Sequence, residues 1–142
     1  MPSGPLLDRI DLHVEVESVP LQDLMATRNR SESSEVIRER VIKARTIQSA
    51  RFGSVEGICC NARIPEQDLD RYCLLEAAAK KFLFTRMEKL QLSARSYSRI
   101  VKVSRTIADL AGVGTVGMEH IAEAIYFRGF DRSVELGRKR IQ

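Results

Sequence analysis

Residues 92–110 read LSARSYSRIVKVSRTIADL and carry the most regular pattern in the chain. Apolar or small side chains recur there at intervals of three and four residues, which is the repeat of one face of an α-helix. The positions on this face are Tyr97, Ile100, Val101, Ser104, Ile107, Ala108 and Ala111. Ser93 can cap this helix at its start, and Gly112 and Gly114 can end it. The stretch therefore predicts an amphipathic helix with one buried face.

Weaker helical patterns flank this segment on both sides. They predict helices over about 34–51, 65–72, 74–90 and 117–128. Their expected inward positions are Ile37, Val41, Ala44 and Ile47 in the first, Leu75, Ala79, Phe82, Leu83, Met87 and Leu90 in the third, and Met118, Ile121, Ala122 and Ile125 in the last. Each amphipathic helix must bury its apolar face, so the segments together predict one small helical bundle.

The segment 10–16 has a different period. Its apolar residues alternate with polar ones, so Ile10, Leu12, Val14 and Val16 share one face, as in a β-strand. Nothing later in the chain resembles a partner strand, and a lone strand leaves its backbone hydrogen-bonding groups unpaired. We therefore expect a mainly α fold preceded by one orphan β-strand, whose sheet belongs to sequence upstream of this fragment.

Composition narrows the class of protein. The chain has 142 residues, is 44% hydrophobic and 30% charged, and carries a formal charge of +4, which permits phosphate contacts without requiring a nucleic acid. Three cysteines without CxxC spacing argue against a disulfide framework or a zinc site and favour reduced thiols in a cytoplasmic protein. The chain contains no apolar run of about 18 residues, so no membrane contact is expected.

Basic residues are the candidates for chemistry. Arg95, Arg99 and Lys102 share a face of the predicted helix, and Arg95 lies in its first turn, where an anion would be favoured. The face can hold phosphate or DNA, or it can simply be solvated. Arg9, between two carboxylates, is either a surface ion pair or a group that reaches a phosphate on a neighbouring subunit. The histidines are not at metal-ligand spacing, so no metal site is expected, and the glycines do not form a P-loop.

Three segments resemble one known family in matching order and spacing. Residues 3–12 resemble the end of the AAA+ core in the YifB/ComM group of magnesium-chelatase-related proteins. Residues 92–110 resemble the lid helix of that group, and residues 120–125, with Arg128 and 131–132, resemble its closing helix. The resemblance implies a domain division into the tail end of the core at 1–20, a linker at 21–32, the helical lid at 33–131 and a basic, disordered tail at 132–142.

The resemblance also implies roles for two residues. Arg9 would be an arginine finger that reaches ATP bound in the adjacent protomer, and Arg95 would be the second sensor of ATP bound in its own protomer. The full-length protein would bind ATP and Mg²⁺ and form a homo-oligomeric, hexameric ring, with its own AAA+ core and neighbouring protomers as partners. The fragment alone lacks the Walker A and B motifs, so it would bind no cofactor and hydrolyse no ATP.

Several functions remain open at this point. The resemblance implies ATP-driven remodelling, with DNA branch migration in the ComM-like branch and metal insertion in the chelatase subunits. A stand-alone helical DNA-binding module would instead use Arg99 and Lys102 together with the basic residues 138–140. A plain interaction domain without a ligand is the third alternative.

Overall fold

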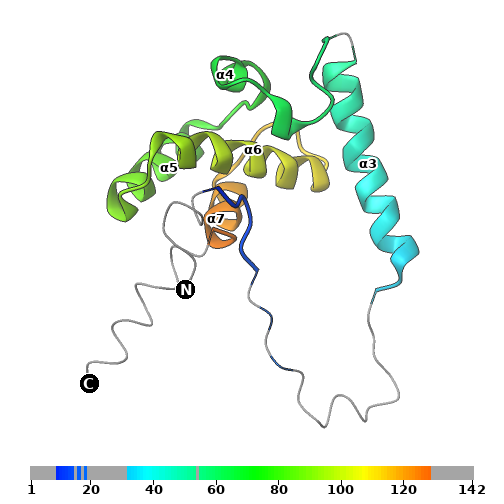
Figure 1. Ribbon diagram of the computed structural model, residues 1–142, viewed down its shortest axis with the longest axis horizontal. Coiled ribbons are helices and arrows are strands. Elements are labelled where there is room, and N and C mark those ends of the chain that lie inside the picture. The colour runs from blue at the N-terminus through cyan, green and yellow to red at the C-terminus, as the bar shows by residue number, and fades with distance from the viewer. Residues whose placement is uncertain (1–8, 15, 17, 19–31, 54, 129–142) are drawn as a thin grey trace.

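The computed structural model describes residues 9–14, 16, 18, 32–53 and 55–128. Its elements are α3 (Ser34–Phe52), the 3-10 helices η1 (Asn61–Arg63) and η2 (Glu66–Asp68), α4 (Leu69–Tyr72), α5 (Ala77–Leu90), α6 (Ala94–Leu110) and α7 (Met118–Tyr126). Helix α6 is central: α3, α4, η1 and α7 all pack against it, and α5 packs against α7 (Figure 1). The prediction of a mainly helical domain is confirmed.

The central helix forms where its sequence pattern predicts it. The hydroxyl oxygen of Ser93 accepts a hydrogen bond from the backbone N–H of Ser96 at 3.2 Å, so Ser93 is the N-cap. Ile100, Val101 and Ala108 are fully buried on the predicted face. The helix ends before Gly112, whose positive φ of 73° is a conformation that glycine adopts without strain.

Two neighbouring helices differ in detail from their predictions. Helix α5 begins at Ala77 and not at residue 74, because the backbone just before it pairs with Val116 in an isolated parallel bridge. In α7, Ile121, Ala124 and Ile125 are buried, while Met118 and Ala122 are exposed. The predicted inward positions of α7 were therefore half right.

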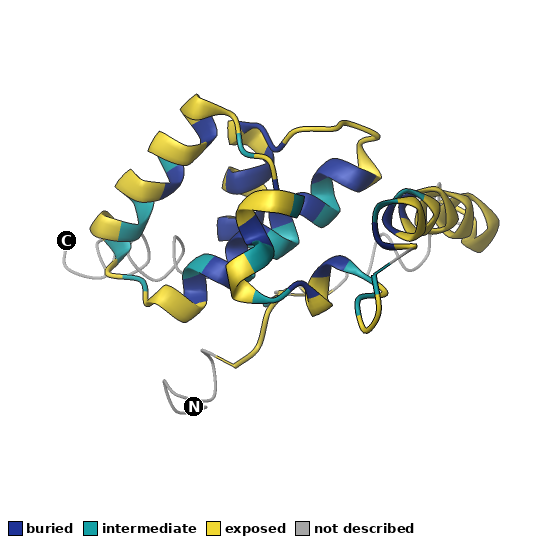
Figure 2. Cartoon of the chain, turned by 90° about the horizontal axis from the view of Figure 1, so that it is seen from above, coloured by how far each residue is buried: buried dark blue, intermediate teal, exposed yellow. Residues whose placement is uncertain are grey.

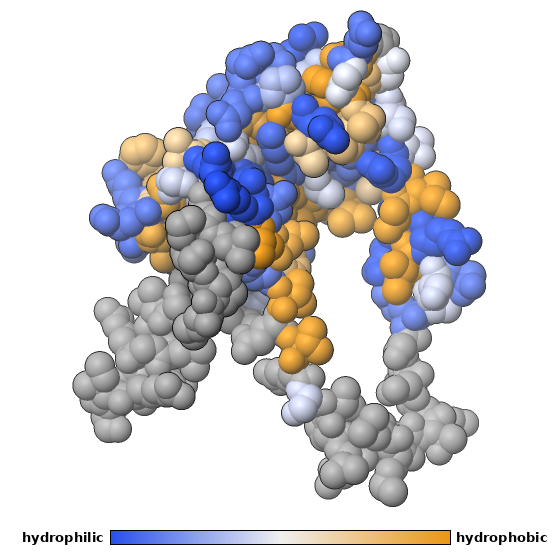
Figure 3. Space-filling model, in the orientation of Figure 1, coloured by the Kyte–Doolittle hydropathy of each residue, from blue (hydrophilic) through white to orange (hydrophobic). Residues whose placement is uncertain are grey.

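Helix α3 was expected to bury an apolar stripe along its whole length, and this prediction is wrong for its N-terminal half. Ile37 and Val41 are 44% and 48% exposed, whereas Ala44, Gln48 and Phe52 are buried. The reason is that the described residues pack only against the C-terminal part of α3, so its first turns extend away from the bundle (Figure 1) and most of its surface is exposed (Figure 2). Hydrophobic side chains are consequently visible on the surface of α3 (Figure 3).

The described residues of the predicted strand, 10–14 and 16, form no strand. The segment lies against the C-terminal end of α7, where the backbone N–H of His13 donates to the carbonyl oxygen of Phe127 at 2.5 Å. The imidazole Nδ1 of His13 also lies 3.0 Å from the carbonyl oxygen of Arg128. A ladder needs a neighbouring strand, and the described part of the chain offers none here. The predicted tail, and the predicted linker apart from residue 32, lie outside the described residues.

A buried polar network ties the elements of the bundle together. The Asp109 carboxylate, on α6, accepts hydrogen bonds from Arg51 of α3 at 2.8 Å and from the side-chain amide of Asn61 of η1 at 2.7 Å. Arg105 lies 3.0 Å from the same carboxylate and donates to the carbonyl oxygens of Val113 and Gly114 at 2.5 and 2.6 Å. The network thus fixes α3, η1 and the loop after α6 on one carboxylate.

The Asp109 network predicts acid sensitivity. Burial raises the pKa of Asp109, but the hydrogen bonds from Arg51 and Asn61 and the charge of Arg105 outweigh it, so the pKa lies below its usual 3.8. A lowered folded-state pKa stabilises the protein above the unfolded value, and this contribution is lost as the pH falls through the folded value. We expect the free energy of unfolding, measured with urea, to decrease as the pH is lowered below about 4, and to decrease less in the Asp109→Asn variant. An equal pH dependence in both proteins would contradict this assignment.

None of the helices in the described part of the chain combines the length and the apolar content that a membrane span requires.

Candidate functional site

Arg95 lies in the first turn of α6, where the sequence predicts it. Its side chain is exposed and has no hydrogen bond or ion pair among the residues that the structure describes. The neighbouring Ser96 amide is satisfied by the Ser93 cap, and the Ser98 hydroxyl donates to the Arg95 carbonyl at 3.1 Å. The backbone around Arg95 is therefore fixed, while its guanidinium is accessible to an external anion. The positive end of the α6 dipole would favour such an anion further.

Arg99 lies one helical turn after Arg95 and has a different environment. Its side chain is 26% exposed, and its Nη1 donates to the carbonyl oxygen of Arg9 at 2.7 Å. The same nitrogen forms an ion pair with the carboxylate of Asp11. Arg99 is therefore engaged by the N-terminal segment and does not present a free guanidinium to phosphate.

Lys102, the third residue of the predicted basic face, is half-buried. Its ammonium group lies 3.5 Å from the carbonyl oxygen of Ala62, which belongs to η1. Because Arg99 and Lys102 both have intramolecular partners, the three residues do not form one uniformly free basic surface. Arg95 is the member of the set that makes neither a hydrogen bond nor an ion pair through its side chain with the described residues.

Arg9 is exposed, and its guanidinium makes no hydrogen bond or ion pair with the described residues. Its backbone, in contrast, is held: the carbonyl oxygen of Arg9 accepts from Arg99, and that of the next residue, Ile10, accepts from Arg128 at 3.4 Å. The structure therefore joins the segment that carries Arg9 to the helix that carries Arg95. It shows no direct contact between the two guanidinium groups.

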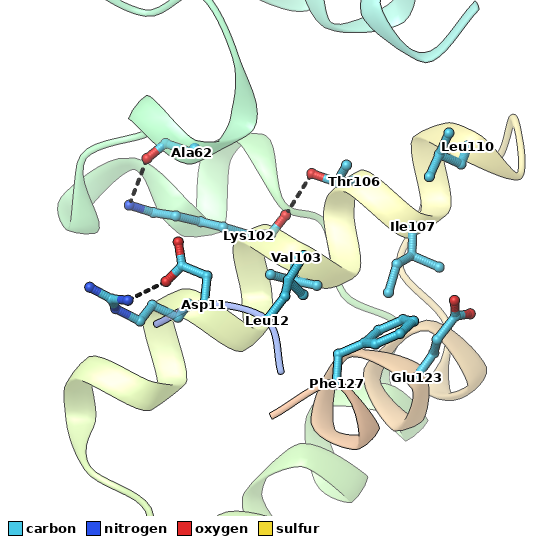
Figure 4. A pocket seen from close by; sticks show the side chains of 11 residues that line it. Asp11, Leu12, Ala62, Lys102, Val103, Thr106, Ile107, Leu110, Glu123 and Phe127 are labelled. Atoms are coloured by element: carbon cyan, nitrogen blue, oxygen red, sulfur yellow. Dashed lines mark hydrogen bonds and ion pairs between the residues drawn. The ribbon is translucent and has the colours of Figure 1, made fainter. Parts of the chain in front are cut away.

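An apolar cavity of about 390 Å³ lies beside this junction, between the N-terminal segment, α6, α7 and η1. Leu12 enters it from the N-terminal segment, and Val103, Ile107 and Phe127 line it from the two helices (Figure 4). The Arg99–Asp11 ion pair and Lys102 lie at its polar side (Figure 4). A smaller cavity of about 300 Å³ lies between η1, α6 and residues 41–48 of α3, and shares three lining residues with the first. Together they form an apolar surface along one side of α6.

Sequence reasoning missed the partners that organise this site. Asp11 was counted as part of a strand, and its pairing with Arg99 spans most of the chain. Asn61 and Asp109 were not singled out, because neither belongs to a motif and their contact depends on packing. The one local signal was the spacing of Arg105 and Asp109, four residues apart on one helix face. The described residues contain no group of three metal-ligating side chains.

Comparison with known proteins identifies a matching family and several similar proteins. The family described as the C-terminal region of magnesium chelatase subunit ChlI matches residues 31–128. The chain is 42% identical over 133 residues to the competence protein ComM of Haemophilus influenzae, which covers 94% of this chain and 25% of that protein. It is 35% identical over 130 residues to the YifB proteins of Salmonella typhimurium and Escherichia coli, again covering 92% of this chain and 25% of each relative. The chain thus spans about a quarter of the length of these relatives.

Proposed function

The chain belongs to the ComM/YifB-like family of magnesium-chelatase-related proteins, and from this premise we propose that it is the helical lid of an AAA+ ATPase. In this proposal Arg95 senses the γ-phosphate of ATP bound in the same protomer. Arg9 acts as an arginine finger on ATP bound in the next protomer of a ring. ATP and Mg²⁺ are bound by a core domain that a longer protein supplies, and the remodelled substrate is DNA.

The observation that carries the proposal is the state of Arg95. It is exposed and unpaired within the described residues, at the start of the best-defined helix of the domain. Accepting an arginine in a first turn is locally unfavourable by about 0.3–1 kcal/mol unless an anion compensates it. A nucleotide phosphate held by the guanidinium would supply that compensation.

The exposed apolar surfaces support the presence of a core domain. Ile37 and Val41 of α3 are exposed although they lie on its apolar side, and the cavity along α6 is lined mainly by hydrophobic residues. Burying such surface is favourable by about 25 cal/mol per Å². A lid that closes on a nucleotide-binding core would cover apolar surface of this kind.

The remodelling of DNA is proposed from family membership. One relative bears the name competence protein ComM, and the resemblance implies branch migration for that branch of the family. Metal insertion, the activity of the chelatase subunits, is the alternative substrate class for the same ATP-driven ring. A direct DNA site on the basic face is less favoured, because Arg99 and Lys102 already have intramolecular partners.

The test is to replace Arg95 by alanine in the ATPase that contains this chain. We expect the steady-state kcat for ATP hydrolysis to fall by about 100-fold or more, since a single charged donor to a reacting group contributes on this scale. The preference for ATP over ADP in equilibrium binding should also decrease, because the side chain is proposed to contact the γ-phosphate.

Lys80→Ala is the matched control. Lys80 is an exposed cation in the first turn of α5, at the opposite end of that helix from the short loop that leads into α6 and Arg95, so its removal changes the net charge equally. It should leave kcat and nucleotide preference unchanged. Normal turnover in Arg95→Ala, or an equal loss in Lys80→Ala, would overturn the sensor assignment.

A further inference from the structure

The contacts of Arg99 join two parts of the chain that the proposed function treats separately. One nitrogen of its guanidinium binds both the carbonyl oxygen of Arg9, at 2.7 Å, and the carboxylate of Asp11. Arg99 itself is four residues after Arg95 on α6, which places the two about one turn, or roughly 6 Å, apart along the helix. A single side chain thus spans from the helix of one arginine to the backbone of the other.

The remaining contacts of the N-terminal segment reinforce this junction. The His13 backbone N–H binds the Phe127 carbonyl at 2.5 Å, and an Arg128 nitrogen lies 3.4 Å from the Ile10 carbonyl. Leu12 fills part of the apolar cavity between α6 and α7. The consecutive residues 9–13 therefore all contact the helical domain, and Arg99 provides the contact to Arg9 itself.

From these contacts we propose that Arg99 is a positioning residue. The contact between Arg99 and Asp11, called the clasp below, holds the N-terminal segment against α6. Arg9, the proposed finger, would then move together with α6, the helix of the proposed sensor Arg95. This inference rests on the proposed function, because it assigns a consequence to the roles of Arg9 and Arg95. A rotation of α6 that accompanies nucleotide exchange in one protomer would then reposition the arginine offered to its neighbour.

Stability alone does not account for such a contact. Asp11 is 56% exposed, and ion pairs open to solvent contribute only about 0–1 kcal/mol to folding. Catalysis is far more sensitive to geometry, since a displacement of about 1 Å can lower a rate by about 100-fold. The clasp is therefore expected to act on kcat and hardly at all on the folding of the bundle.

The experiment compares three variants of the ATPase that contains this chain. Two are the single variants Arg99→Ala and Asp11→Ala. The third is a double variant, the charge exchange, which combines Arg99→Asp with Asp11→Arg. We expect each single variant to lower kcat for ATP hydrolysis by about 10–100-fold while the KM for ATP changes by less than about twofold. The charge exchange should recover at least part of kcat, because it restores an ion pair at the same place. The melting temperature should stay within a few degrees of the starting protein.

Arg40→Ala is the matched control, because Arg40 of α3 forms an exposed ion pair at 2.6 Å with Glu32, which precedes that helix. It should leave kcat unchanged. A second measurement uses the 142-residue chain alone: in Arg99→Ala, amide hydrogen exchange should accelerate at residues 9–13, while exchange within α6 stays unchanged.

The outcomes distinguish a failure of the Arg99–Asp11 clasp from a failure of the proposed role of Arg9. If Arg9→Ala abolishes turnover but Arg99→Ala and Asp11→Ala do not reduce it, the clasp is wrong and the finger stands. If amide hydrogen exchange at residues 9–13 accelerates in Arg99→Ala but Arg9→Ala retains full turnover, the contact exists and the proposed role of Arg9 is wrong. If the single variants raise KM and lower the melting temperature as well as kcat, and the charge exchange rescues none of these, Arg99 has a merely structural role and the proposal is overturned.

Discussion

Replacing Asp109 by alanine is expected to lower the free energy of unfolding by about 3–5 kcal/mol, a large share of the roughly 5–15 kcal/mol that stabilises a typical domain. The Asp109 side chain is fully buried, and the side chains of Arg51 and Arg105 are 17% and 1% exposed. Removing the carboxylate leaves two guanidinium groups with little access to water and no opposing charge. Such uncompensated buried charge costs far more than the intact network contributes.

The measurement is urea unfolding followed by circular dichroism, at neutral pH. Glu88→Ala is the control, because Glu88 is an exposed carboxylate of α5 and its loss should change the free energy by less than about 0.5 kcal/mol. A change below about 1 kcal/mol in Asp109→Ala would mean that water or a rearranged partner compensates the arginines. The network would then not be what holds α3 and η1 on α6.

Local patterns predicted the helices of this domain well, because helix formation depends on spacing that the sequence displays directly. Residues 92–112 combine a cap, a continuous apolar face and a terminal glycine, and α6 follows this pattern closely. Helix α3 had a cap and a terminal glycine but a weaker apolar pattern, and two of its four expected inward positions, Ile37 and Val41, are exposed. Periodicity shows which side of a helix is apolar, but whether a partner covers that side depends on the rest of the fold.

From the sequence, only the local position of a candidate residue could be predicted. Arg95 was singled out because it lies in a first turn, and the structure places it there with an exposed guanidinium. Asp11 and Arg99 are 88 positions apart, so their pairing follows from the docking of the N-terminal segment and not from any spacing. The alternation over 10–16 was misleading for a related reason: an alternating segment becomes a strand only beside another strand, and here it docks against α6 and α7.

The largest effect on activity is expected at Arg9. In the full-length ATPase that we propose for this chain, Arg9→Ala should lower kcat by about 1,000-fold or more, the range known for arginine fingers, with little change in ATP affinity. The reason is that a finger stabilises charge that develops in the transition state and contributes less to the bound substrate. Steady-state turnover and equilibrium nucleotide binding measure the two effects separately. A parallel loss of affinity and kcat would show that Arg9 contacts ground-state ATP or supports the fold.

Mixing two inactive variants distinguishes action across a subunit boundary from action within one subunit. In a ring with head-to-tail interfaces, consider ATP bound by an Arg9→Ala protomer whose neighbour is an Arg95→Ala protomer. The first protomer still supplies Arg95 and the neighbour still supplies Arg9, so this site contains both arginines. An equal mixture should therefore regain about a quarter of the original turnover per site. A variant that lacks both arginines, mixed with Arg9→Ala, should regain none, since no protomer then supplies Arg9. If the first mixture stays inactive although the protomers exchange between rings, both arginines serve the same subunit and the ring arrangement proposed here is wrong.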